Sequence, residues 1–194
     1  MRTLTRIHNE KSGYADRMLK DEVLSSTTVA SPLGALSLVA SKQGLMLVEF
    51  SRRAPKLLHG RHVMHSDDNP VLDIAAAQLD EYFQGTRQRF NIPLDLVGTP
   101  FQVEVWKALS KVRFGSTMSY AQEAAMIGRP TAVRAVGGAN GRNPVPIVLP
   151  CHRVIAADGG LGGFSAGLPK KVWLQNHERT VADAGKQRSP SRVG

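Results

Sequence analysis

Residues 119–138 read Ser-Tyr-Ala-Gln-Glu-Ala-Ala-Met-Ile-Gly-Arg-Pro-Thr-Ala-Val-Arg-Ala-Val-Gly-Gly, and this pattern predicts two short helices joined by a tight turn. Ser119 and Gln122 have the spacing of a capping box, in which the side chain of each residue accepts a hydrogen bond from the backbone N–H of the other. We therefore expect the first helix to begin there and to run to Ile127. Gly-Arg-Pro at 128–130 supplies the turn, because neither Gly nor Pro continues a helix well.

The second of these helices, expected over residues 132–138 with Thr131 as its cap, is made almost wholly of Ala, Val and Gly. Its backbone can approach another surface closely, and Arg134 is its only long side chain. Two short helices across such a turn have the dimensions of a helix-turn-helix, but an ordinary helical hairpin in a core has them too. Against DNA, Ala132, Gly137 and their neighbours could enter a groove while Arg134 reaches into the base stack.

The helix before this pair begins at a second capping box, Thr99-Pro100-Phe101-Gln102. Its apolar face is predicted to consist of Phe101, Val105, Leu109 and Val112. Val97-Gly98 precedes this box, and we place a domain boundary there.

The first half of the chain has a different pattern. Short apolar runs over 28–30, 35–40 and 45–50, separated by Gly-containing turns, predict a small antiparallel sheet. Residues 51–68 are polar, and we interpret them as a solvated loop despite His59, His62 and His65. Asn69-Pro70 is typical of a helix start, and the run ends at Gly85.

The predicted fold class is therefore α+β. A small N-terminal domain with an antiparallel sheet and a helix spans residues 27–97, after a flexible lead-in over 1–26. A mainly helical C-terminal domain with the helix-turn-helix spans 98–180, and a basic flexible tail follows over 181–194.

Charge is concentrated in the second half of this 194-residue chain, whose formal net charge is +9. Residues 1–97 hold 12 basic and 11 acidic side chains, whereas residues 98–194 hold 13 and 5. A basic half suits a polyanion partner, although a cationic solvated surface would look the same. We see neither a signal peptide nor a membrane span in the sequence and expect a cytoplasmic protein.

The chain has one cysteine, Cys151, in the run Pro150-Cys151-His152-Arg153-Val154. A lone cysteine excludes an internal disulfide and a four-thiolate metal site, and we predict no metal and no cofactor. Histidine and positive charge beside a thiol favour the thiolate, so we interpret Cys151 as a nucleophile in a reducing compartment.

A glycine-rich stretch follows, with glycines at 159, 160, 162, 163 and 167. It lacks the Lys-Ser/Thr of a phosphate loop and is suited to wrap a flat ligand. Pro169 opens a last helix, expected to end near His177-Glu178. Spacing alone favours a solvated carboxylate at Glu178 over one that orients His152.

The sequence resembles the O6-alkylguanine-DNA alkyltransferases, a family of DNA repair proteins. The resemblance rests on Pro150-Cys151-His152-Arg153-Val154 and extends over about residues 27–180. It includes Thr99-Pro100-Phe101-Gln102, Ser119-Tyr120, Arg134-Ala135-Val136-Gly137, Asn143-Pro144, Pro146-Ile147 and His177-Glu178.

This resemblance implies a single-turnover reaction in which Cys151 takes the alkyl group of a flipped O6-alkylguanine, and of O4-alkylthymine. It implies that His152, oriented by Glu178, deprotonates the thiol through a water. Tyr120 would assist the departing guanine, and Asn143 would brace the turn that carries the site. The base pocket would be formed by Pro146, by the Ser165 amide and by the carbonyls of Cys151 and Val154.

The implied partner is double-stranded DNA, bound through the minor groove by Thr131, Ala132, Arg134 and Gly137, with Arg134 replacing the flipped base. We expect a monomer, and cooperative binding on DNA stays open. Phe164-Ser165-Ala166 departs from the family's commoner Tyr-Ala/Ser-Gly, which would change the pocket width. Two other functions fit the residues alone: a turning-over cysteine hydrolase and a non-enzymatic helix-turn-helix regulator.

Overall fold

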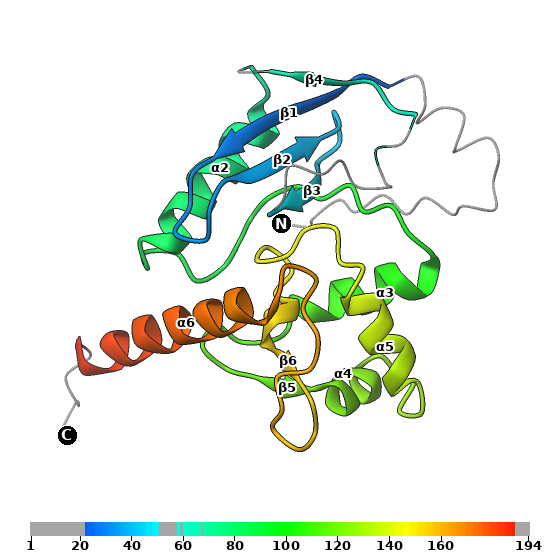
Figure 1. Cartoon of the computed structure of the whole chain (residues 1–194), viewed down its shortest axis with the longest axis vertical. Coiled ribbons are helices and arrows are strands. Elements are labelled where there is room, and N and C mark those ends of the chain that lie inside the picture. The colour runs from blue at the N-terminus through cyan, green and yellow to red at the C-terminus, as the bar shows by residue number, and fades with distance from the viewer. Residues whose placement is uncertain (1–21, 51–57, 59, 67, 189–194) are drawn as a thin grey trace, which may run out of the picture.

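The computed structural model describes residues 22–50, 58, 60–66 and 68–188, which form a sheet-bearing N-terminal part and a mainly helical C-terminal part (Figure 1). The N-terminal part holds a four-stranded sheet covered by one helix. The C-terminal part is mainly helical, with a two-stranded sheet. The predicted α+β class is confirmed.

The N-terminal sheet has the strand order β3-β2-β1-β4. Strands β1 (Leu24–Val29), β2 (Leu36–Ala40) and β3 (Leu45–Glu49) form the antiparallel sheet that the sequence predicts. Because β1 begins at Leu24, the expected lead-in over 1–26 is too long by three residues. The described part of that lead-in, residues 22–26, is therefore mostly sheet.

Strand β4 (Val63–His65) corrects the expectation of a solvated loop over 51–68. It pairs with β1 in parallel, so the sheet is mixed. All three of its side chains are exposed, and the pairing rests on the backbone. The amide of Leu24 donates to the carbonyl of His62 at 2.8 Å, and that of Ser66 to Ser26 at 3.0 Å. Because β4 pairs through its backbone alone and buries no side chain, its sequence lacks the alternation of polar and apolar residues by which a strand is predicted. His59 lies outside the described residues.

Helix α2 (Pro70–Phe83) begins as predicted. The Asn69 side chain accepts from the amides of Val71 and Leu72, and Pro70 occupies the first turn, where its missing N–H costs nothing. Its buried face, with Leu72, Ala75 and Leu79, joins the same hydrophobic cluster as the sheet residues Leu36 and Leu38.

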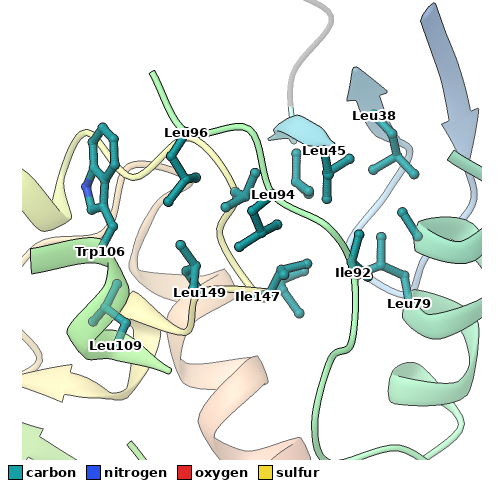
Figure 2. Packing of buried hydrophobic residues seen from close by; sticks show 14 of the residues in the cluster. Leu38, Leu45, Leu79, Ile92, Leu94, Leu96, Trp106, Leu109, Ile147 and Leu149 are labelled. Atoms are coloured by element: carbon teal, nitrogen blue, oxygen red, sulfur yellow. The ribbon is translucent and has the colours of Figure 1, made fainter. Parts of the chain in front are cut away.

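The connection between the two parts of the chain is itself core. Ile92, Leu94 and Leu96 are buried between the N-terminal strands and helix α3 (Pro100–Leu109), as Figure 2 shows. Leu94 bridges to Leu45 of β3, and Trp106 of α3 closes the same cluster. Both parts therefore share one hydrophobic core, which fixes the C-terminal site against the N-terminal sheet.

The predicted helix-turn-helix is present as α4 (Tyr120–Met126) and α5 (Val133–Asn140). Both capping boxes form: Thr99 with Gln102 at α3, and Ser119 with Gln122 at α4. The prediction for Thr131 is wrong, because the cap of α5 is Ala132 and no side chain caps that end. The helix also runs two residues beyond the predicted end at 138.

Two further predictions in the C-terminal part are wrong. Residues 147–149 are not a strand but part of a turn in which Ile147 has a positive φ of 75°. The Asn143 side chain takes the backbone groups that a strand would use, at Val145 and Leu149. Helix α6 (Leu168–Arg188) continues well past Glu178, so residues 181–188 are helix rather than flexible tail. The rest of the predicted basic tail, residues 189–194, lies outside the described residues.

Candidate active site

Cys151 lies on a short 3-10 turn, η2 (Cys151–Arg153), which leads into strand β6 (Val154–Ile155) beside β5 (Met118–Ser119). The thiol is 5% exposed. Burial raises its pKa to about 11, although a hydrogen bond from Asn143 and the charge of Lys171 work in the other direction. Burial therefore outweighs the neighbouring positive charge at Cys151, and the thiol of the free protein is neutral until a base removes its proton.

Glu178 of α6 is 1% exposed, so the interpretation of it as a solvated carboxylate is wrong. Its oxygens accept five hydrogen bonds. Oε1 accepts from Tyr82 Oη at 2.9 Å, from His152 Nε2 at 2.7 Å and from Arg153 Nη2 at 2.9 Å, and Oε2 accepts from Arg153 Nε at 2.8 Å and the Gly115 amide at 3.1 Å. Burial alone would raise the pKa of Glu178, but the partners His152 and Arg153 outweigh it and hold the pKa at about 2.

This network fixes the state of His152. An ionised Glu178 can only accept, so His152 Nε2 must carry a proton. Burial lowers the pKa of His152, and the ring is therefore neutral with Nδ1 as a free acceptor. Nδ1 is buried and has no partner among the described residues. A neutral imidazole with one oriented donor and one open acceptor is the form that a general base requires.

Asn143 braces the segment before the thiol. Its Nδ2 donates to the Leu149 carbonyl at 2.6 Å, and its Oδ1 accepts from the Val145 amide at 3.1 Å. The same amide lowers the pKa of the Cys151 thiol, against the effect of burial. One buried side chain thus closes the turn that delivers Cys151.

Tyr120, the first residue of α4, lies against the glycine-rich stretch. The backbone amide of Gly163 hydrogen-bonds to its hydroxyl, and burial raises its pKa. A Cβ atom at Gly162, which has a φ of +63°, would lie 2.7 Å from the Tyr120 hydroxyl. Only glycine permits both that backbone and that contact. Ser165, in the same stretch, is exposed.

The pocket residues Pro146 and Val154 are both buried. The Val154 carbonyl already accepts from Lys171 Nζ at 2.6 Å, which leaves its second lone pair for a ligand. The carbonyl of Cys151 accepts from the Val154 amide.

Helix α5 carries the predicted DNA-contacting residues next to this site. Arg134 is exposed on it, as are Thr131 before its start and Ala135. A Cβ atom at Gly137 would lie 3.8 Å from the Tyr120 ring, so this face of α5 adjoins the residue beside the thiol pocket. Tyr120 therefore lies between the glycine-rich stretch and helix α5 of the helix-turn-helix.

Three residues of the site were missed by the sequence reasoning. Lys171 is fully buried and donates to the carbonyls of Val154, Leu161 and Gly163, which ties the glycine-rich stretch to the start of β6. From the sequence, Arg153 counts only as a positive charge beside the thiol, and Tyr82 gives no sign of a role in the site. Lys171 looks like any lysine of a solvated helix, since it follows Lys170. Tyr82 lies 96 positions from its partner Glu178, so no local sequence pattern indicates either role.

A cleft of about 560 Å³ lies between residues 88–90 and 110–114, next to Arg153 of the Glu178 hydrogen-bond network. Pro150 and Arg153 line it, whereas Cys151 and Tyr120 do not. The nucleophile and the base therefore lie outside this cleft, at the thiol and its partners.

In the part of the chain that the structure describes, no three His, Cys, Asp or Glu side chains gather as a metal site requires. Within the same residues, no helix is long and apolar enough to cross a membrane.

Fold and site together define a class: a two-domain α+β protein with one buried thiol, backed by a His-Glu pair, under a helix-turn-helix. Two family models match the chain: "6-O-methylguanine DNA methyltransferase, ribonuclease-like domain" over residues 24–96 and "6-O-methylguanine DNA methyltransferase, DNA binding domain" over 100–180. The chain belongs to the 6-O-methylguanine DNA methyltransferase family.

Named relatives agree with this assignment. The constitutive methylated-DNA–protein-cysteine methyltransferase of Bacillus subtilis is 41% identical over 156 residues, which are 79% of this chain and 94% of that protein. The Mycobacterium tuberculosis methyltransferase is 41% identical over 157 residues, 81% of this chain and 93% of that protein. The crystal structure of M. tuberculosis OGT in complex with DNA matches with a TM-score of 0.73 and 38% identity, over 82% of this chain and 94% of that one.

Proposed function

We propose that this protein repairs DNA by direct reversal and moves the alkyl group of O6-alkylguanine onto its own Cys151. The observation that carries the proposal is a neutral, buried thiol beside a neutral histidine with one open acceptor, in a region that adjoins a helix-turn-helix. The relatives named as methylated-DNA–protein-cysteine methyltransferases, and the DNA complex of the M. tuberculosis protein, support it.

The proposed step is a displacement at the alkyl carbon. The Cys151 sulfur forms a bond to that carbon as the carbon–O6 bond breaks, and the electron pair of the broken bond goes to the guanine. The thiol proton goes to His152 Nδ1 through a water. Proton removal must accompany attack, because the thiol has a pKa of about 11 and is not ionised beforehand.

The guanine leaves as a neutral base when it gains a proton, and Tyr120 is the proposed donor. The Ser165 amide is proposed to bind the guanine oxygen, and the second lone pairs of the Cys151 and Val154 carbonyls its amino group. The product is a thioether, which the chain cannot reverse with a second thiol since Cys151 is its only cysteine. The protein is therefore a single-turnover reagent. O4-alkylthymine is proposed as a second substrate.

The proposed DNA complex places α5 in the minor groove, with Arg134 in the space of the flipped nucleotide. Thr131, Ala132 and Gly137 would contact the backbone. We propose that one monomer acts on each lesion.

Mass spectrometry tests the proposal directly. After incubation with duplex DNA that contains O6-methylguanine, the Cys151 peptide should gain the mass of one methyl group in place of a hydrogen, and C151S should gain nothing. With DNA in excess, methyl transfer should stop at one per protein. Sustained turnover would instead identify a cysteine hydrolase, and a folded protein with no adduct would identify a regulator.

The role of Arg134 has its own test. R134A should slow transfer from duplex DNA far more than transfer from a free O6-alkylguanine base, which needs no flipping. R142A is the matched control, because Arg142 is also exposed and lies just after α5, where its Nη1 donates to Gly138. Equal losses on both substrates in R134A would contradict the proposed insertion.

A further inference from the structure

Glu123 is an acidic side chain buried inside the helix-turn-helix. It belongs to α4 and is 0% exposed. Its neighbour Ala124 lies in a small hydrophobic cluster with Val105, Val136 and Ala139, which joins α3, α4 and α5. Ionised carboxylates are costly in such a place unless a cation or several donors compensate for the lost hydration.

Glu123 has one hydrogen-bond partner in the described structure. Asn140, at the end of α5, donates from Nδ2 to Glu123 Oε2 at 2.6 Å. The other two polar atoms of the pair, Glu123 Oε1 and Asn140 Oδ1, are both buried and both without a partner among the described residues. If Glu123 is ionised, both atoms are acceptors, and neither can satisfy the other.

We propose that, below neutral pH, Glu123 is a protonated carboxylic acid that forms a two-hydrogen-bond ring with the Asn140 amide. In this ring Asn140 Nδ2 donates to Glu123 Oε2, and the Glu123 Oε1 hydroxyl donates to Asn140 Oδ1. A carboxylic acid and a primary amide each offer one donor beside one acceptor, so their edges are complementary. One proton on Glu123 Oε1 thus gives a hydrogen-bond partner to both Glu123 Oε1 and Asn140 Oδ1.

The surrounding charges agree with a neutral acid. Burial raises the pKa of Glu123 to about 7, although the Asn140 hydrogen bond lowers it. On its own helix the ionisable neighbour is Tyr120, and across from it lies Cys151; both carry raised pKa values and are uncharged at neutral pH.

The elements packed against α4 are α3, α5, β5 and β6. Helix α3 offers Glu104, which pairs with Arg129 at the surface, and the exposed Lys107. Helix α5 offers the exposed Arg134, and the two strands carry no ionisable side chain. In the described structure no cation is bonded to Glu123 in place of a proton.

The pair is a positioning device for the helix-turn-helix. It links α4, which begins with Tyr120, to the last residue of α5, which carries Arg134. A second buried bond, from Trp106 Nε1 to the Ala139 carbonyl at 2.8 Å, ties α3 to the same end of α5. Together they would fix the spacing between the base pocket and the DNA-facing helix. This consequence for repair rests on the proposed function; the protonation state does not.

An NMR titration of the Glu123 side-chain carboxyl carbon tests the proton directly in the intact protein, with E123Q used for assignment. The signal should titrate near pH 7, rather than near the ordinary value of about 4.3. A midpoint below about 5 would mean an ionised carboxylate, with a water on the orphaned atoms, and would overturn the proposal.

Variants provide an independent test. E123Q replaces the acid by an amide that keeps both hydrogen bonds at every pH, whereas E123L leaves Asn140 unpaired. Since a raised native pKa makes the wild type lose stability as pH rises between about 4.5 and 7, the advantage of E123Q over wild type should grow across that range. A difference that does not change with pH would refute the ring. Both readouts are independent of methyl transfer, so a failure of the proposed function would be recognised separately.

The repair consequence is measured by the ratio of E123Q to wild-type transfer rates on methylated duplex, which should rise as pH passes through 7. E123L should be slow at every pH, and rescue by the amide but not by the apolar side chain would separate positioning from simple space filling. A ratio that stays constant would show that the pair does not act on the reaction.

Discussion

At the scale of single residues, burial outweighs the sequence neighbourhood at the thiol. His152 and Arg153 follow Cys151 directly, yet both direct their side chains to Glu178. The positive charge of Arg153 is thereby neutralised by the carboxylate, and the thiol is left with desolvation as the dominant influence. A cysteine followed by His-Arg is not activated by adjacency; its activation depends on where those side chains point.

The Cys151 thiol should therefore react slowly with small alkylating reagents. Because its pKa is about 11, its rate with iodoacetamide should rise about tenfold per pH unit between about pH 7 and 10. The same protein unfolded in urea should level off above its ordinary thiol pKa of about 8.5. Mass spectrometry of the carbamidomethylated peptide gives both curves. A plateau in the folded protein below about pH 9 would contradict the neutral thiol.

The pH dependence that Glu178 gives to stability has the opposite sign to that of Glu123, because the native pKa of Glu178 is lowered and that of Glu123 is raised. The native Glu178 pKa of about 2 is below the unfolded value of about 4.3, so it stabilises the fold above the unfolded value and loses this as pH falls toward 2. E178Q should lose about 3–5 kcal/mol at neutral pH, because buried Arg153 is left without its charge partner.

The gap between wild type and E178Q should narrow by up to about 3 kcal/mol as pH falls from about 5 to 2.5. Urea unfolding at several pH values measures it. E104Q is the control, since Glu104 forms an exposed pair whose loss should cost at most about 1 kcal/mol. A gap for E178Q that stays constant with pH would show that the carboxylate is not held ionised by its partners.

At the scale of elements, the helix starts were predictable and the irregular segments were not. Asn69, Thr99 and Ser119 cap helices through atoms within three residues, and all three predictions are confirmed. Strand β4 and the turn at Ile147 are determined by distant partners: the β1 backbone and the Asn143 amide. The site was predicted through the resemblance, while Lys171 and Tyr82 act across the fold and leave no local pattern.

The glycine-rich stretch supports a prediction at this scale. Gly162 and Gly159 both have positive φ, at +63° and +85°, but only at Gly162 would a Cβ meet a neighbour, the Tyr120 hydroxyl. G162A and G159A should each lose about 1 kcal/mol from backbone strain. Only G162A should also slow transfer, by about ten- to a hundredfold, because it displaces Tyr120 or the loop.

Single-turnover rates on methylated duplex, together with urea unfolding, separate the two effects. G159A serves as the control for backbone strain alone. Equal rates in the two variants would show that the Gly162–Tyr120 contact has no part in the reaction.

At the scale of the whole molecule, the N-terminal part is built into the site. The Tyr82 hydroxyl, from α2, donates to Glu178 at 2.9 Å, and its ring packs on Phe90 and Phe114. The backbone carbonyl of Tyr82 also lies 2.8 Å from His177 Nε2 of α6. Since Glu178 orients His152, the sheet-bearing part of the chain reaches the proposed base through one phenol and one carboxylate.

Removal of that hydroxyl should affect both stability and reaction. Y82F takes one of five donors from Glu178, and a hydrogen bond to a charged group contributes about 1.5–3 kcal/mol. With fewer donors the pKa of Glu178 should rise, so on acidification Y82F should begin to lose stability at a higher pH than the wild type does. Transfer should slow because His152 is held less firmly.

F90L is the matched control, because the Phe90 ring centroid lies 5.5 Å from that of Tyr82 and Phe90 has no bond to Glu178. It should lose packing energy at all pH values alike, with no shift of the acid transition. If Y82F behaves as F90L does, the N-terminal part contributes packing to this site and nothing to its proton chemistry.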